Sequence, residues 1–170
     1  MANEVYTRTN QALFFARKAV ASWEEVSQSG ALDSVTQSVY HREHALFHLY
    51  RGVLAVIHEV ADRYRWPLMD ARSVESVLHG DAASRFPGPE LAELSELAHA
   101  TDSWLGRLLE GWQRLQAPPV PIESKPVSDN LIVASNASST IREWSRDDAH
   151  EALAALAERI ARYREGMVEW

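Results

Sequence analysis

The strongest pattern in the chain is that of residues 33–65, DSVTQSVYHREHALFHLYRGVLAVIHEVADRYR. Their apolar side chains recur at alternating steps of three and four residues, which brings them onto one side of a helix. Asp33 or Ser34 can cap the beginning of this helix. Trp66 ends it, because a residue that precedes a proline disfavours helical geometry. The stretch therefore predicts a long helix at the centre of a bundle, with a seam made of Val39, Leu46, Tyr50, Val53, Ile57, Val60 and Tyr64.

The same three-four spacing recurs in three further stretches, which predict helices at about 3–28, 89–116 and 147–169. A weaker pattern predicts a short helix at about 72–79. The stretch 89–116 has an alternative, a restart at residues 101–103 with Asp102 as the cap. The spacing continues without error through that point, so one helix is the first interpretation.

These elements predict an all-α protein, an antiparallel four-helix bundle with a short extra helix in the 66–88 connection. A long irregular connector at 117–146 completes the chain, and residues 130–135 within it are predicted to form a short strand or an extended segment. A connector of this length is unusual in a compact domain. We expect residues 1–170 to form a single helical domain.

Composition narrows the class of protein. Apolar residues make up 46% and charged residues 24% of the 170 positions, as in ordinary globular proteins. There is no cysteine, which excludes disulfides, thiolate metal sites and a cysteine nucleophile. The net charge of -7 argues against nucleic-acid binding. The sequence has no secretory signal and no apolar run of about 18 residues, so we expect a soluble cytoplasmic protein without a membrane partner.

Histidines crowd the beginning of the central helix. His41, His44 and His48 are spaced so that they share one face, and imidazoles four residues apart on a helix can bind a metal ion. This face is expected to lie nearly opposite the seam, however, so we interpret it as a solvated face. The pattern is not HExxH, and no metal, cofactor or catalytic residue is predicted.

Glu43 interrupts the seam at a position where an apolar residue is expected. Three interpretations remain open: a buried acid, an ion pair with an arginine of another helix, or the end of the core. Glu43, His44 and His48, together with Arg51, are the candidate binding residues.

Two further features have structural interpretations. Arg51 and His58 have the spacing R-x6-H, which resembles that of some HEPN-type helical ribonucleases. Those enzymes prefer a polar residue after the arginine, and here Gly52 follows it. We interpret four tryptophans as exposed residues with structural roles at helix ends: Trp23, Trp66, Trp144 and Trp170.

Five segments carry a resemblance to known sequences: 1–11, MANEVYTRTNQ; 45–50, ALFHLY; 89–94, PELAEL; 102–105, DSWL; and 130–132, NLI. Through them the chain resembles an uncharacterised bacterial family of small helical proteins, a domain of unknown function. The resemblance implies one full-length domain of bacterial origin, and it transfers no activity or site residue.

Three hypotheses of function follow. The first is a non-enzymatic interaction or assembly protein, a homodimer or a complex with a protein partner. It would use an exposed part of a seam or the 117–146 connector. The second is a metal- or small-ligand-binding bundle that uses the histidines of the 33–65 helix. The third is a HEPN-like ribonuclease.

Overall fold

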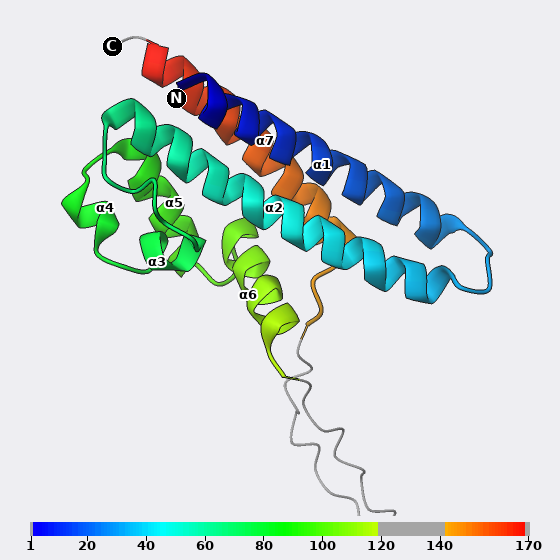
Figure 1. Ribbon diagram of the computed structural model, residues 1–170. Helices are drawn as coiled ribbons and strands as arrows, with labels where there is room; N and C mark the ends of the chain where they lie inside the picture. The colour runs from blue at the N-terminus through cyan, green and yellow to red at the C-terminus, as the bar shows by residue number, and fades with distance from the viewer. Residues whose placement is uncertain (1, 119–141, 169–170) are drawn as a thin grey trace, which may run out of the picture.

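The structure, a computed structural model, describes residues 2–118 and 142–168, and every regular element within these ranges is a helix (Figure 1). The all-α prediction is therefore confirmed. The segment 130–135 and most of the 117–146 connector lie outside the described residues.

The two longest neighbours are α1 (Ala2–Gln28) and α2 (Ser34–Tyr64), which form an antiparallel hairpin (Figure 1). Small side chains on α1 allow the two backbones to come close, because they occupy little space between the helices. Ala12, Ala16 and Ala19 are 4%, 0% and 6% exposed. The seam of α2 is buried from Leu46 to Val60, as its spacing predicts.

The last helix, α7 (Arg146–Val168), returns along both helices of the hairpin. Near its end, Arg164 donates hydrogen bonds of 2.7 and 3.0 Å to Glu59 of α2 and one of 2.9 Å to Asn10 of α1. Just before its beginning, Trp144 stacks on Trp23 of α1 with ring centroids 5.8 Å apart. The expectation that these two tryptophans are exposed was wrong, since each indole covers the other and both are buried.

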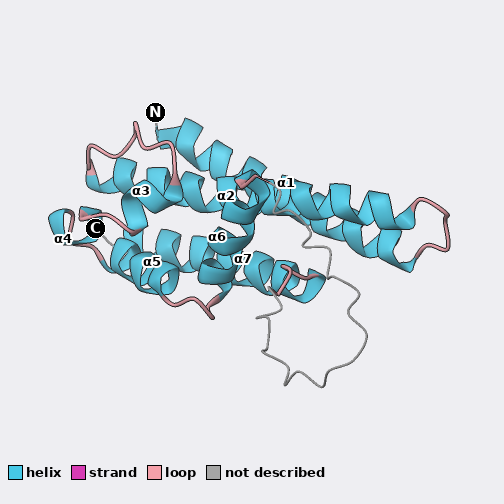
Figure 2. Ribbon diagram, turned by 90° about the horizontal axis from the view of Figure 1, so that it is seen from below, coloured by secondary structure: helices cyan, strands magenta, loops and turns pink. Residues whose placement is uncertain are grey.

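Four shorter helices cover the remaining side of the core: α3 (Val74–Leu78), α4 (Ala82–Arg85), α5 (Pro89–His99) and α6 (Trp104–Gln116). Figure 2 shows α5, α6 and α7 lying along one side of the molecule and the hairpin along the other. The 66–88 connection thus contains two short helices where the sequence predicted one. Helices α5 and α6 together occupy the place of the fourth long helix.

The stretch 89–116 is divided at residues 100–103. Ser103 caps α6: its hydroxyl accepts a hydrogen bond of 2.9 Å from the backbone N–H of Gly106 and donates one of 2.6 Å to the carbonyl of Leu97. Gly106 makes the sharp turn possible, because a Cβ at this position would lie 2.2 Å from the carbonyl oxygen of Ala100. The restart occurs where the alternative predicted it, with Ser103 instead of Asp102 as the cap.

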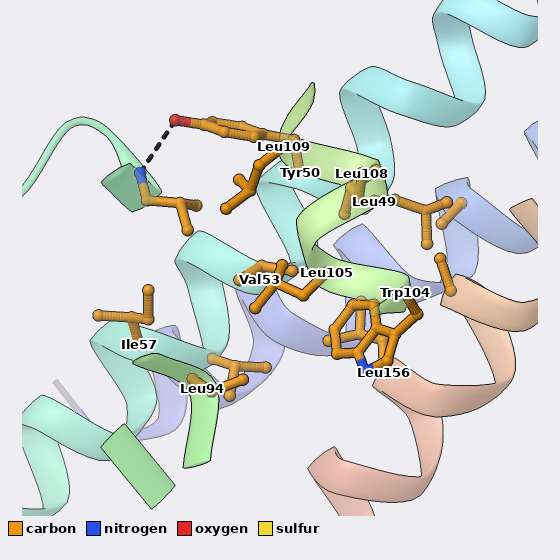
Figure 3. Packing of buried hydrophobic residues seen from close by; sticks show 14 of the residues in the cluster. Leu49, Tyr50, Val53, Ile57, Leu94, Trp104, Leu105, Leu108, Leu109 and Leu156 are labelled. Atoms are coloured by element: carbon orange, nitrogen blue, oxygen red, sulfur yellow. Dashed lines mark hydrogen bonds between the residues drawn. The ribbon is translucent and has the colours of Figure 1, made fainter. Parts of the chain in front are cut away.

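All these elements share one core (Figure 3). Tyr50 of α2 ties the short helices to it: its hydroxyl accepts a hydrogen bond of 2.9 Å from the N–H of Val74 and donates one of 2.6 Å to Glu75. Burial and the bond to Glu75 raise the pKa of Tyr50 to about 12. The most completely buried large side chains include Leu49, Val53, Ile57, Leu94, Leu105, Leu108 and Leu156.

The core does not reach the turn of the hairpin. Both α1 and α2 extend past the beginning of α7 and the end of α6 (Figures 1 and 2). On the uncovered part, Leu32, Val35 and Val39 are 107%, 77% and 39% exposed. We call residues 26–40 the hairpin tip.

Candidate functional site

A groove of about 290 Å³ runs between α1 and α2 on the outer side of the hairpin. We call it the histidine groove. Three rings on α2, those of His41, His44 and His48, line it. The remaining lining residues are Phe15, Lys18, Ala19 and Ser22 of α1 and Tyr40 of α2.

The face of α2 that carries His41, His44 and His48 is less exposed to solvent than its position relative to the seam predicted. His41 and His48 are half-buried and only His44 is exposed. The reason is that α2 is covered on two adjacent flanks, one by α6 and α7 and the other by α1. Phe15 of α1 makes an edge-on contact with the ring of His48, with centroids 5.3 Å apart. The face interpreted as solvated is therefore exposed at His44 and half-buried at His41 and His48.

Electrostatic repulsion characterises this side of the hairpin. Burial lowers the pKa of His48, and the positive charges of His44 and Arg51 lower it further. Burial likewise lowers the pKa of His58, against a hydrogen bond to the Ala71 carbonyl that raises it, and the charges of Arg8 and Arg72 add to the lowering. No acidic side chain of the residues that the structure describes contributes to either shift.

The cations of this side also lack acidic partners. Arg8, Lys18, Arg51 and Arg72 form no ion pair with any carboxylate in the described part of the chain. The opposite side of the molecule differs. There arginines pair with carboxylates, as in Arg162–Glu93 at 2.7 Å, Arg164–Glu59 at 2.7 Å and Arg107–Asp148 at 3.0 Å.

Glu43 lies on a different surface from the histidines. It lines a second groove of about 340 Å³, bounded by α2, α6 and the residues before α7. Its side chain is exposed and makes no ion pair with another described residue, whereas Arg42 beside it pairs with Glu143 at 3.0 Å. Of the three interpretations of Glu43, the end of the core is the one that this placement fits. The second groove is lined by Arg42, Glu43, Leu46, Gly111, Arg114, Leu115, Glu143 and Trp144.

The structure thus brings three of the four candidate binding residues, His44, His48 and Arg51, to one side of the hairpin and leaves Glu43 apart. Lys18 and Phe15, which complete the histidine groove, were not singled out from the sequence. They belong to another helix, and only the antiparallel pairing of α1 with α2 brings them opposite His44 and His48.

This geometry gives little support to the metal-binding hypothesis or to the ribonuclease hypothesis. The described residues contain no group of three or more His, Asp or Glu side chains that could hold a metal ion. The ring of His58 is 6% exposed, and its Nε2 lies 3.0 Å from the carbonyl oxygen of Ala71. This ring is therefore poorly placed to act with Arg51 on a nucleic acid.

The fold and the groove define a class: an all-α bundle whose hairpin carries an open, basic, ring-lined groove on an acidic molecule. No helix in the described ranges is long and apolar enough to cross a membrane. The chain belongs to DUF6586, a family of unknown function whose model matches residues 1–170. No curated protein and no solved structure matches the chain.

Proposed function

We propose that this protein is a non-enzymatic assembly protein that pairs with a second copy of itself through the hairpin tip. One observation carries the proposal, the exposed continuation of the α2 seam beyond the core. Val35 and Val39 are four residues apart on α2, which keeps them on one face, and Leu32 lies in the turn just before this helix. Further along α2, the same seam is buried from Leu46 onward.

Apolar exposure of this kind favours an interface. Monomeric proteins rarely expose a contiguous apolar patch of more than a few hundred Å². Burying one leucine or valine from full exposure contributes about 1.5–3 kcal/mol. Part of that gain offsets the entropy lost when two molecules associate.

Charge favours a second copy as the occupant. The hairpin tip carries a single charged side chain, Asp33, whereas the whole chain has a net charge of -7. Two copies repel each other over most of their surfaces, but this repulsion is weakest where both surfaces are nearly neutral. The tip is therefore the surface at which two copies can meet most easily.

A single domain over residues 1–170 and a cytoplasmic location belong to the same proposal. The first is supported by a core cluster that includes side chains from Leu13 to Met167. The second is supported by the lack of cysteine. The proposal includes neither nucleic acid nor a membrane as a partner.

The test is the oligomeric state of the full chain in solution. Sedimentation velocity over roughly 1–100 μM should detect a concentration-dependent dimer. Val35→Glu should weaken its dissociation constant at least about tenfold, because a charge would be buried in an apolar contact. Phe14→Glu is the matched control, since Phe14 is 54% exposed on α1 outside the tip. A wild-type monomer throughout this range, or equal weakening by both variants, would overturn the proposal.

A further inference from the structure

The nitrogen atoms of the histidine groove are arranged asymmetrically. Nδ1 of His41 and Nδ1 of His48 are buried and have no hydrogen-bond partner among the described residues. Both rings line the groove, and Nε2 of neither ring is among the buried atoms that lack a partner in the described part of the chain. A ligand that enters the groove can therefore reach Nε2 of these rings and not Nδ1.

Burial of Nδ1 decides which tautomer each neutral ring adopts. A neutral imidazole carries one N–H and one lone pair. A buried N–H without an acceptor is rarer in proteins than a buried acceptor without a donor. The proton therefore belongs on Nε2, and His41 and His48 present N–H donors to the groove.

Donors of this kind suit an anion and not a metal ion, because a metal needs the lone pair that the buried Nδ1 retains. The other polar groups of the groove also suit an anion. Lys18 has donors only, and the hydroxyls of Ser22 and Tyr40 can donate. Among the described residues, no carboxylate lines the groove.

Ring faces supply the second part of the recognition. Phe15 meets His48 edge-on, and the ring centroids of Tyr40 and His44 are 4.3 Å apart. Aromatic surfaces of this type favour a planar ligand, which stacks or packs edge-on against them. A volume of about 290 Å³ suits a small molecule better than a polymer.

We propose that the histidine groove binds a small planar organic anion, an oxyanion group carried on a ring. The oxyanion lies against Lys18 and the Nε2–H groups of His41 and His48, and the ring packs among Phe15, Tyr40 and His44. Tyr40 is the one lining residue that this site shares with the hairpin tip, and binding does not depend on dimer formation.

Benzenesulfonate is the probe, because it is planar and keeps its charge at all pH values that the protein tolerates. The readout is the set of histidine ring signals in ¹H–¹⁵N spectra of the ¹⁵N-labelled full chain. In the free protein, His41 and His48 should appear as Nε2–H tautomers at about neutral pH. The probe should shift the signals of His41, His44 and His48 and leave that of His58 unchanged. An Nδ1–H tautomer in both rings, or no shift at millimolar probe, would overturn the proposal.

Two further probes separate charge from shape. Inorganic sulfate has the oxyanion without the ring, and benzyl alcohol has the ring without the charge. Each should bind at least about tenfold more weakly than benzenesulfonate, since each loses one part of the recognition. Equal binding of either one would contradict a site for a planar anion. Zinc that binds the untagged protein more tightly than benzenesulfonate would also contradict it.

Lys18→Met tests the position of the charge. It should weaken benzenesulfonate binding about tenfold, because a charge-assisted hydrogen bond is lost. Arg17→Met is the matched control: Arg17 is the exposed neighbour on α1, does not line the groove, and its loss changes the net charge equally. Equal effects of the two variants would mean unspecific attraction and would refute the site.

Binding should strengthen as the pH falls from about 8 to about 5.5, because a bound anion favours the protonated form of His48 among the groove imidazoles, and burial lowers the pKa of this ring. The charged and titratable groups that face them are Lys18 from α1 and Tyr40 and Arg51 from α2. A flat profile would contradict the assigned role of the histidines.

Discussion

Asp148 is a buried acid with two arginine partners. Its side chain is 3% exposed and pairs with Arg142 at 2.9 Å and with Arg107 at 3.0 Å. It also accepts hydrogen bonds of 2.8 Å from the N–H and from the hydroxyl of Ser145, while the Ser145 hydroxyl accepts the N–H of Asp148 at 3.2 Å. This reciprocal pair is a capping box that starts α7. The spacing of Ser145 and Asp148 is visible in the sequence, but their arginine partners are not.

Asp148→Asn should lower the free energy of unfolding at about pH 7 by about 2–4 kcal/mol, because it leaves two arginines without their buried partner. Burial raises the pKa of Asp148, but the bonds from Ser145 and the charges of Arg142 and Arg107 outweigh burial and lower the pKa overall. The contribution is therefore present above the unfolded pKa, about 3.9, and is lost as the pH falls through the lower folded value.

Urea unfolding at about pH 7 and about pH 3 measures this difference. The gap between wild type and Asp148→Asn should narrow at the lower pH. Asp147→Asn is the control, since Asp147 is an exposed acid in the same helical turn. An equal loss in the control would show that the charge near the helix end matters and the buried pairs do not.

At the scale of elements, the close junction between α5 and α6 depends on Gly106. Gly106→Ala should destabilise the protein by about 1–3 kcal/mol or more, because its Cβ would meet backbone that cannot easily move. Gly30→Ala is the control, since nothing lies within 4 Å of a Cβ at that position. Thermal unfolding followed by circular dichroism compares the two. A gain in stability for Gly106→Ala would mean that the junction is not tightly closed.

The apolar spacing predicted which side of each long helix is buried, because that side depends only on local geometry. Thr9 and Ala16 of α1 and Leu46 and Val53 of α2 are all buried as their spacing predicts. The spacing could not reveal the break at residues 100–103, since it runs through the break unchanged.

The candidate site was predictable only on the α2 side. The spacing of His41, His44 and His48 showed that they share a face, but not that α1 covers one edge of it. The position of a side chain relative to one apolar seam predicts its burial only when the helix is buried on one side. Helix α2 is buried on two sides. Lys18 and Phe15 therefore could not be found without the tertiary structure.

At the scale of the molecule, charge is divided unevenly. The chain has a net charge of -7, yet unpaired cations gather on one side of the hairpin and only Asp33 is charged in the hairpin tip. If two copies pair through their tips, raising the salt concentration from about 0.02 M to about 0.5 M should tighten the dimer, because screening weakens the repulsion between two acidic bodies. Sedimentation equilibrium at both concentrations measures this change. Weaker association at high salt would indicate an interface held by opposite charges.

Because α7 is the last helix to be synthesised, its contacts with the hairpin form late in translation. Leu156 of α7 is 1% exposed and packs so closely on α2 that a Cβ at Gly52 would lie 2.8 Å from it. Residues 65–156 must be synthesised after the hairpin before this contact can form, which takes roughly 5–20 s at ordinary translation speeds. Throughout that time the part of the hairpin that α7 later covers is open on the ribosome. The speed of translation, and not the stability of the finished bundle, sets how long this nascent chain is open to wrong associations.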